Sequence, residues 1–485
     1  MNVIVICLDT FRADLVGEGE NLRFVETPCL DQLAKEGVRF VSAYGEGQPT
    51  LQARRSFFTG MRSFPWRFNF DRRGHWHHAP GWHKIPPDHD TLAEILCARG
   101  YFTGLVSDTM HLFKPTMNYT RGFCTWDFVR GQIDDTWRGG TPRMVAEQMA
   151  RHVRKPINWR RHVTLMQYLL NNRHRQSEED YLPARVMTSA AQWLEDNHGN
   201  APFFLWVDVF DPHEPWDPPK SYADRYMPGH KGMEFIMPSL GWEHGEPTEE
   251  EKGRMQALYF GEVSLVDKWI GHLVETVDRL KLRDDTIFVV TSDHGAQVGD
   301  NGGMGKSPRD LRSYNTRILL LIRHPDGPRG HFEEGFVQAH DLASTLCGML
   351  GIPFIGDGRD FWPMAVNGGP PVRDHVVIGW AQFSRGRACG YASVRDSEWN
   401  YCVGTGFEDP EPKLYHLTKD PGEKTNVVGK YPEVVALQRR RIEAILRQPL
   451  PGKHEEMCGD ARSPLHICAD HWFHGEGGPA LPSDQ

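Results

Sequence analysis

The sequence predicts an α/β protein with a large mixed, mainly parallel sheet sandwiched by helices, and a smaller C-terminal α+β subdomain. Two observations lead to this fold class. Short, uniformly apolar stretches alternate with amphipathic helical stretches over most of the chain, as in βαβ units. Charged residues directly follow several of these apolar stretches, as expected where parallel strands end at one edge of a sheet.

The N-terminal part begins with an apolar strand over Met1–Leu8, which ends at Asp9. Thr27-Pro28 then introduces an amphipathic helix, and Gly37 ends it as a C-cap glycine. The alternation continues with strands predicted over 38–44, 101–107, 202–210, 286–291 and 317–322, and with helices over 91–99 and 339–350.

Three parts are predicted along the chain. Residues 1–370 form the main domain, 371–450 a subdomain of short strands followed by a helix over 432–447, and 451–485 a tail. A basic, helical insertion at about 137–184 interrupts the main domain, and Pro156 breaks its helix. A solvated rim is the favoured interpretation of this insertion, and a lid that steers an anionic substrate is the alternative.

The composition restricts the partners of the protein. The 485 residues carry a net charge of −9, which argues against nucleic acid. No apolar run approaches the roughly 20 residues that span a bilayer, and no basic segment precedes Val3–Leu8, so neither a membrane span nor a signal peptide is predicted. The nine cysteines lack CxxC spacing and predict reduced thiols in a cytoplasmic protein. A homo-oligomer is left open.

Acidic and histidine side chains follow three of the predicted strands. They are Asp9 after the first strand, Asp211 and His213 after strand 202–210, and Asp293-His294 after strand 286–291. Singly, each acid is equally a turn former or a helix cap. Together, Asp9, Asp293 and His294 predict a site for Mn²⁺, Zn²⁺, Ca²⁺ or Mg²⁺, because carboxylate and imidazole ligands suit such ions.

The segment GQPTLQARRSFFTG, residues 47–60, places Thr50 where a loop gives way to a helix, four residues before Arg54. Taken alone, Thr50 reads as a turn residue. A neighbouring metal makes its hydroxyl a candidate nucleophile, since coordination lowers the pKa of an alcohol. Arg54 would hold an oxyanion, His213 would protonate the leaving oxygen and Lys306 would neutralise charge on the transferred group.

Two further groups of residues are weighed as binding elements. Asp108 and His111 follow strand 101–107 and are predicted to contact substrate at the same edge. The histidine-rich stretch over 72–84 is interpreted as an aromatic loop or surface turn rather than a second metal site. A second ion held by Asp211, His213 and His340 is the less favoured alternative to one metal with His213 as the acid.

Several motifs occur together in one order, namely TPCLDQLAKEGVRFVSAY, QARRSFFTG, DPHEPWDPP, TSDHGAQVGDNGGMGK and KLYHLTKDPGEKTN. With them, the chain resembles the sulfatase family of the alkaline phosphatase superfamily from Met1 to about Arg447. The pattern DxxRAD at 9–14 and the pair Ala53-Arg54 are most similar to the phosphonate monoester hydrolase and phosphodiesterase branch. The resemblance implies an alkaline phosphatase-like fold and one divalent metal held by Asp9, Thr50, Asp293 and His294. It also places Arg54, His213 and Lys306 at anion-handling positions.

Two departures from the family pattern shape the expected chemistry. Thr50 stands where sulfatases carry the cysteine or serine that becomes formylglycine, and no formylglycine is expected because oxidised threonine would be a ketone. The usual acidic pair after the first strand is Asp9-Thr10 here, which favours Mn²⁺ or Zn²⁺ over Ca²⁺. The predicted function is hydrolysis of small phosphate mono- or diesters or phosphonate monoesters through a covalent Thr50 intermediate. The alternatives are a sulfatase that works without formylglycine, a phosphotransferase or mutase, and a degenerate binding protein.

Overall fold

The computed structural model describes residues 1–17, 24–65, 82, 84–238, 245–384, 387–405 and 412–451. The predicted tail lies outside these residues beyond Pro451, as do the histidines at 75, 77, 78 and 83. No helix in the described ranges is both long and apolar enough to cross a membrane.

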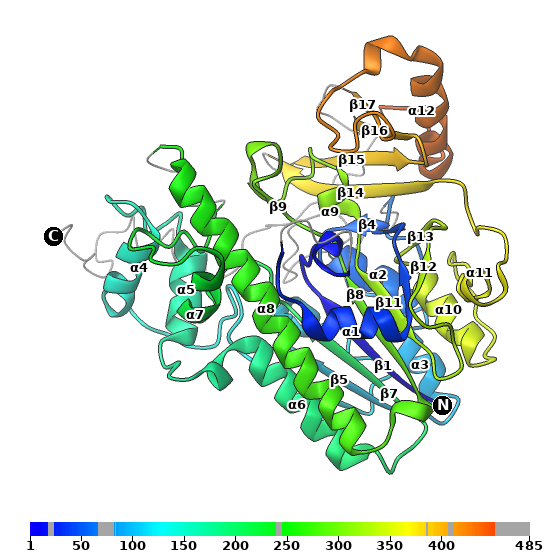
Figure 1. Ribbon diagram of the computed structural model, residues 1–485, viewed down its shortest axis with the longest axis horizontal. Helices are drawn as coiled ribbons and strands as arrows, with labels where there is room; N and C mark the ends of the chain where they lie inside the picture. The colour runs from blue at the N-terminus through cyan, green and yellow to red at the C-terminus, as the bar shows by residue number, and fades with distance from the viewer. Residues whose placement is uncertain are drawn as a thin grey trace.

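An eight-stranded mixed sheet forms the centre of the main domain, in the order β12-β2-β11-β8-β1-β7-β5-β6 (Figure 1). Its strands are β1 (Asn2–Leu8), β2 (Val38–Phe40), β5 (Phe102–Ser107), β6 (Thr125–Phe128), β7 (Phe203–Val209), β8 (Thr286–Ser292), β11 (Leu320–Arg323) and β12 (His331–Glu333). The five strands from β8 to β6 are parallel, and β11 joins them antiparallel. The mixed, mainly parallel sheet is therefore confirmed.

Helices cover both faces of this sheet because its central strands are apolar on both sides. In β1, Ile4, Ile6 and Leu8 face one core, and Val3, Val5 and Cys7 face the other. The first core includes α1 (Pro28–Glu36), α6 (Leu182–Asn197) and α8 (Glu249–Arg279). The second includes α2 (Leu51–Thr59), α3 (Leu92–Cys97), α10 (Asp341–Met349) and α11 (Trp362–Asn367).

The structure corrects one local prediction and confirms another. The single strand predicted over 38–44 is wrong: a turn at Val41-Ser42 separates β2 from β3 (Ala43–Tyr44), which pairs with β13 (Val337–Gln338) instead. Gly37 is the C-cap of α1, as predicted, and its backbone is extended with φ −142°. A Cβ at Gly37 would lie 2.5 Å from the Ile322 carbonyl oxygen, and this close approach accounts for the glycine.

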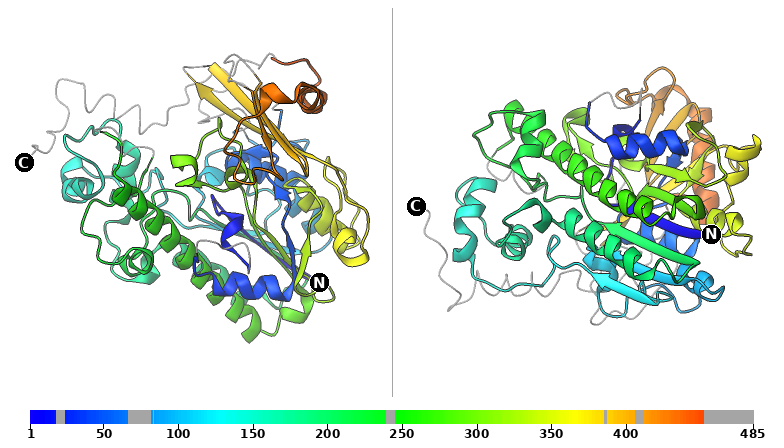
Figure 2. Two further views of the ribbon diagram at one scale, coloured as in Figure 1. Left: turned by 45° about the horizontal axis from the view of Figure 1, so that its top comes forward. Right: turned by 60° about the horizontal axis from the view of Figure 1, so that its bottom comes forward.

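The basic insertion folds into α4 (Ala146–His152) and α5 (Val163–Asn172), on either side of Pro156. Helix α6 begins at Leu182, inside the predicted range, and packs against β5 and β7. Figure 2 shows α4, α5 and α7 (Lys220–Tyr226) gathered at one end of α8, away from the sheet.

The C-terminal subdomain is a five-stranded sheet with one helix, as predicted. It contains β14 (Val376–Ser384), β15 (Arg387–Arg395), β16 (Trp399–Gly404), β17 (Lys413–His416) and α12 (Pro432–Leu446). Its fifth strand is β4 (Gly47–Gln48) of the main domain, which pairs parallel with β14 so that Gln48 lies opposite Trp380. The subdomain is therefore hydrogen-bonded to the segment that leads to Thr50.

Candidate active site

Loops at the carboxyl ends of neighbouring parallel strands bring the predicted acids together. The Asp9 N–H donates to the Val209 carbonyl at 2.9 Å, and the Asp293 N–H donates to the Leu8 carbonyl at 3.2 Å. These bonds continue the pairing of β1 with β7 and β8 just beyond the strands. Asp9 and Asp293 therefore emerge side by side at one edge of the sheet.

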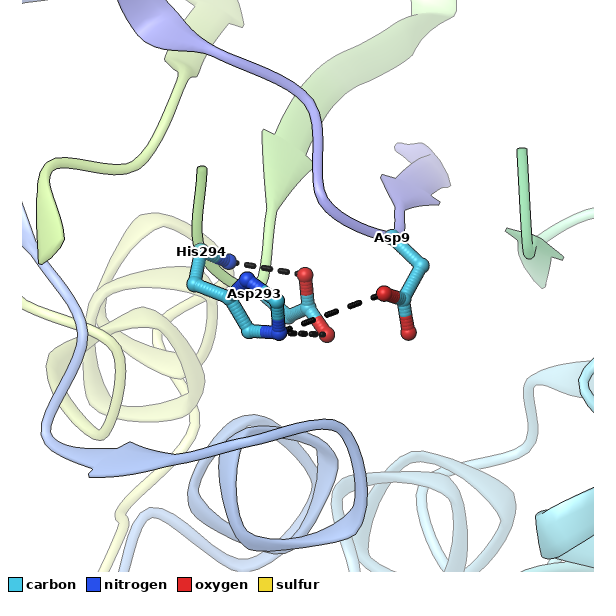
Figure 3. A group of neighbouring side chains, drawn as sticks. All are labelled: Asp9, Asp293 and His294. Atoms are coloured by element: carbon cyan, nitrogen blue, oxygen red, sulfur yellow. Dashed lines mark hydrogen bonds and ion pairs between the residues drawn. The ribbon is translucent and has the colours of Figure 1, made fainter. Parts of the chain in front are cut away.

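Asp9, Asp293 and His294 form a buried cluster, the Asp-Asp-His group, whose ligand atoms all lie within 4.8 Å of one another (Figure 3). His294 Nδ1 bonds the Gly295 carbonyl at 2.8 Å, so the hydrogen is on Nδ1 and the lone pair is on Nε2. Nε2 is buried without a hydrogen bond, 3.6 Å from Asp293 and 4.0 Å from Asp9. Burial lowers the pKa of His294 to about 3, which keeps this nitrogen available as a ligand.

The pKa values of the two carboxylates in the group are shifted in opposite directions. Burial alone would raise the pKa of Asp9, but Arg54 and His213 lower it overall. Burial and the charge of Asp9 raise the pKa of Asp293 well above its usual range. Two adjacent buried carboxylates and a bare imidazole nitrogen fit a divalent cation, which would let both acids ionise.

Thr10, which stands at the position of the missing second acid, hydrogen-bonds both acids of the group. Its hydroxyl donates to Asp9 Oδ1 at 2.6 Å, and its N–H donates to Asp293 Oδ1 at 2.9 Å. Thr10 therefore orients both acids of the Asp-Asp-His group and supplies no charge of its own.

Arg54 lies in the first turn of α2 and joins three acids. Its Nη1 donates to Asp9 Oδ2 at 2.8 Å and to Asp293, and its Nη2 donates to Asp208 Oδ1 at 2.9 Å. Nε also contacts Asp208, and Nη1 lies 3.5 Å from the Thr50 carbonyl oxygen. All four charged side chains are 0% exposed. Because carboxylates bond all three guanidinium nitrogens, an anion near Arg54 would interact with its charge and not with a free N–H group.

Thr50 immediately precedes α2 and is only 2% exposed. Its side chain makes no capping bond to the helix, and its φ of 37° is rare for a β-branched residue. Thr10 also has a positive φ, 62°. Unusual backbone conformations of this kind concentrate at functional sites, which favours the functional interpretation of Thr50 over the turn.

His213 and Lys306 approach the group from two other loops. His213 Nδ1 bonds the Glu214 carbonyl at 2.5 Å, which leaves Nε2 to exchange a proton. Burial lowers the pKa of His213. Lys306 Nζ lies 3.4 Å from both the Glu214 carboxylate and the Thr10 hydroxyl. The structure thus gathers the cationic and proton-transfer residues that the sequence predicts.

The two predicted substrate contacts are buried in this structure. Asp108 is 0% exposed, accepts the Phe210 N–H at 2.8 Å and lies 3.4 Å from Gln132, and burial raises its pKa well above the usual range. His111 packs against the Trp82 ring at 4.9 Å. Asp108 here holds the loop after β7, and a contact of either residue with substrate stays a prediction.

The alternative second-metal set is not gathered in one place. His340 lies at the start of α10, 3.7 Å from Asp341, while Asp211 accepts a bond from Gln132 at 3.0 Å. Within the described ranges, the Asp-Asp-His group is the only cluster with metal-ligand spacing.

Sequence reasoning missed three residues that complete the site. Asp208 fixes Arg54 and also accepts the Thr109 hydroxyl at 2.6 Å. Glu214 pairs with Lys306, and the Trp380 ring lies 5.5 Å from the His294 ring. Of the three, only Asp208 could be recognised in the sequence, because it is an acidic residue inside the apolar strand FFLWVDV.

The sheet presents buried carboxylates and an imidazole at its carboxyl edge, beside a helix that starts at a hydroxyl residue. Metal-dependent ester hydrolases share this arrangement. Within that class, the chain belongs to the sulfatase family of the alkaline phosphatase superfamily, since the Sulfatase family model matches residues 1–352.

Relatives of this chain include enzymes named for different esters. An arylsulfatase of Clostridium perfringens is 25% identical, with 94% of this chain and 95% of that protein covered. The multifunctional alkaline phosphatase superfamily protein PehA of Trinickia caryophylli is 26% identical, with 90% and 93% covered. The crystal structure of a phosphonate monoester hydrolase of Agrobacterium radiobacter has a TM-score of 0.69 and 22% identity, with 92% and 95% covered. That likeness shows the fold.

Proposed function

We propose that the protein hydrolyses phosphate mono- or diesters, or phosphonate monoesters, through covalent attack by Thr50. The observation that carries this proposal is a buried threonine at the start of α2, whose carbonyl contacts the same Arg54 nitrogen that bonds Asp9 and Asp293. A threonine keeps its hydroxyl, whereas formylglycine chemistry needs an aldehyde. The attacking group is therefore an alcohol.

The Asp-Asp-His group and Thr50 would hold one divalent cation, with Mn²⁺ expected first and Zn²⁺, Mg²⁺ or Ca²⁺ as alternatives. Such a cation lowers the pKa of the Thr50 hydroxyl and offsets negative charge on the group that is transferred. Neutral His294 and ionised Asp9 are already in the protonation states that ligation requires.

The chain's own side chains then carry out two displacements. The Thr50 hydroxyl first loses its proton to solvent; Oγ1 then forms a bond to phosphorus while the bond to the leaving oxygen breaks, and protonated His213 gives that oxygen a proton from Nε2. Burial lowers the pKa of His213, so the protonated form that donates this proton would depend on the negative charge of the bound ester. A water oxygen next forms a bond to phosphorus while the bond from phosphorus to Thr50 Oγ1 breaks; His213 Nε2 takes up the water's proton, and Thr50 leaves as the alkoxide that attacks the next ester. Lys306 offsets the negative charge of the transferred group.

Hydrolysis of sulfate esters is the second candidate, favoured by the family match and by the relative named as an arylsulfatase. Transfer of the phosphoryl group from Thr50 to an alcohol, as in a transferase or mutase, would use the same first step. Product analysis with added alcohols separates this reaction from hydrolysis.

The test is turnover of matched phosphate mono-, di- and phosphonate esters and a sulfate ester by the Mn²⁺-loaded protein. We expect the phosphorus esters to react faster than the sulfate ester. Thr50→Ala should abolish turnover, while the amount of bound metal, measured by mass spectrometry, should stay nearly unchanged. Thr50→Ser should keep part of the activity, and acid quenching should trap phosphothreonine in the wild type. A near wild-type rate for Thr50→Ala would refute covalent catalysis, and faster turnover of the sulfate ester would favour the second candidate.

A further inference from the structure

A cavity of about 440 Å³ lies between the basic insertion and α8, outside the Asp-Asp-His group. Figure 1 shows the helices that contribute to it, α4, α5 and α7, beside the outer end of α8. Its walls include Gln148, Arg151 and His152 from α4, Leu169 and Asn172 from α5, Lys220 from α7, and Arg254 and Leu258 from α8. This volume suits a small organic ligand.

The cavity is strongly cationic although the chain carries a net charge of −9. Its lining contains five cationic side chains, Arg151, Arg173, Arg175, Lys220 and Arg254, and two carboxylates, Asp217 and Glu234. A cationic concavity on an acidic protein concentrates anions by focusing the local field.

Two of these arginines are fixed in place. Arg254 Nε donates to Glu234 at 2.7 Å, and Nη1 donates to Asp224 at 3.0 Å. Arg175 donates to Asp217 at 3.0 Å, and its guanidinium lies 4.4 Å from the centre of the Tyr181 ring. Guanidinium groups held in this way lose little conformational entropy when a ligand arrives.

The positive charges of Arg151 and Arg173 are not compensated by nearby carboxylates in the described part of the chain. Neither has a carboxylate within ion-pair distance among the residues that the structure describes, and Arg173 donates only to the Leu170 carbonyl, at 2.9 Å. Arg151 is exposed and Arg173 is half-buried, and both line the cavity. Their charges are available to an incoming oxyanion.

One residue of the cavity wall, Asp217, belongs to the loop that carries His213. Asp217 lies four residues after His213 on the same loop, so at most about 14 Å of extended backbone separates the two. The Asp217 N–H donates to Glu262 of α8 at 2.8 Å, which fixes this end of the loop.

We propose that this cavity binds a multiply charged oxyanion on a small polar molecule, namely a phosphate, sulfate or carboxylate cluster held by Arg151 and Arg173. The oxyanion belongs either to a separate ligand or to the ester substrate, as a second charged group. The latter source rests on the proposed function, whereas binding itself does not.

Binding is tested by calorimetric titration of the metal-loaded full chain with inorganic phosphate. We expect the double variant Arg151→Glu/Arg173→Glu to lose one phosphate-binding event or to weaken it at least about tenfold. Arg143→Glu is the matched control, because Arg143 lies on the same insertion outside the cavity lining and should bind phosphate as the wild type does. Arg151→Lys/Arg173→Lys should retain most of the binding.

Wild-type stoichiometry and affinity in the double glutamate variant would overturn the proposal. The proposal would also be overturned if that variant lost turnover of 4-nitrophenyl phosphate to the same extent as phosphate binding, with its melting temperature unchanged. The arginines would then serve the catalytic site. Propyl phosphate and propane-1,3-diyl bisphosphate distinguish the two sources. A kcat/KM advantage of the bisphosphate that disappears in the double variant supports a charged group on the ester, and phosphate binding without that advantage supports a separate ligand.

Discussion

Arg54 is the only described cation in contact with all three buried acids of the site, so its removal tests the electrostatics directly. In Arg54→Ala, Asp9, Asp208 and Asp293 would remain 0% exposed without their common partner. Removing one partner of a buried ion pair costs about 3–5 kcal/mol. Because three carboxylates share one guanidinium, we expect the free energy of unfolding of the metal-free protein to fall by about 5 kcal/mol.

Metal should reverse part of this loss. A cation bound by Asp9 and Asp293 neutralises two of the three acids and leaves only Asp208 unpaired, so the deficit with Mn²⁺ should shrink to about 3 kcal/mol. Adding Asp208→Asn to Arg54→Ala should recover stability, because it removes the remaining buried charge. Arg54→Lys should be intermediate, since lysine keeps the charge but not the fork.

The assay is urea unfolding of each variant, followed by tryptophan fluorescence with and without Mn²⁺. Arg12→Ala is the matched control: Arg12 is also buried and paired, with Asp14 and Asp300, but it lies outside the Asp-Asp-His group. That variant should be destabilised without rescue by Mn²⁺. The reasoning is refuted if Arg54→Ala lies within about 1 kcal/mol of the wild type, or if Mn²⁺ rescues both variants equally.

Three further predictions concern protonation, leaving groups and packing. The folded pKa of His294, about 3, lies below its unfolded value of about 6.5, so the metal-free protein should lose stability as pH falls through this range. As the pH falls from 6 to 4, the free energy of unfolding of His294→Gln should rise relative to that of the wild type by about 1.4 kcal/mol per pH unit. A difference between the two proteins that does not change with pH would contradict this prediction. His213→Ala should slow the first step, release of the alcohol from alkyl esters, by about 10²–10⁴-fold, but it should hardly affect the initial burst of 4-nitrophenol from a 4-nitrophenyl ester, whose leaving group needs no proton; equal losses in these first-step rates would argue against His213 as the acid. Gly37→Ala should destabilise the fold by about 1–3 kcal/mol because the added Cβ meets the Ile322 carbonyl, whereas Gly199→Ala, with nothing within 4 Å, should be nearly neutral in urea unfolding.

The elements that the sequence predicts best are those whose own residues determine them. The continuous apolar stretch VIVICL requires burial on both faces, and Asp293-His294 directly after TIFVVTS marks the carboxyl edge of a parallel strand. Local chemistry is sufficient in both cases.

Long-range contacts account for the features that the sequence does not predict. Nothing around Arg54 indicates that its nitrogens bond acids on β7 and after β1 and β8, 154, 45 and 239 residues away. Similarly, the pairing of two-residue β4 with β14 has no local pattern, because strands this short carry no periodicity. Such contacts depend on register and packing across the whole sheet.

The β4–β14 pairing restricts how this protein can be recombined with its relatives. A chimera that exchanges the C-terminal subdomain would also exchange the strand that pairs with Gly47 and Gln48, immediately before Pro49-Thr50. A foreign β14 that is shifted by one residue would present its opposite face to the His294 ring in place of Trp380. A crossover point after Ile352, where the family match ends, is therefore compatible with activity only if the transplanted strand keeps its register.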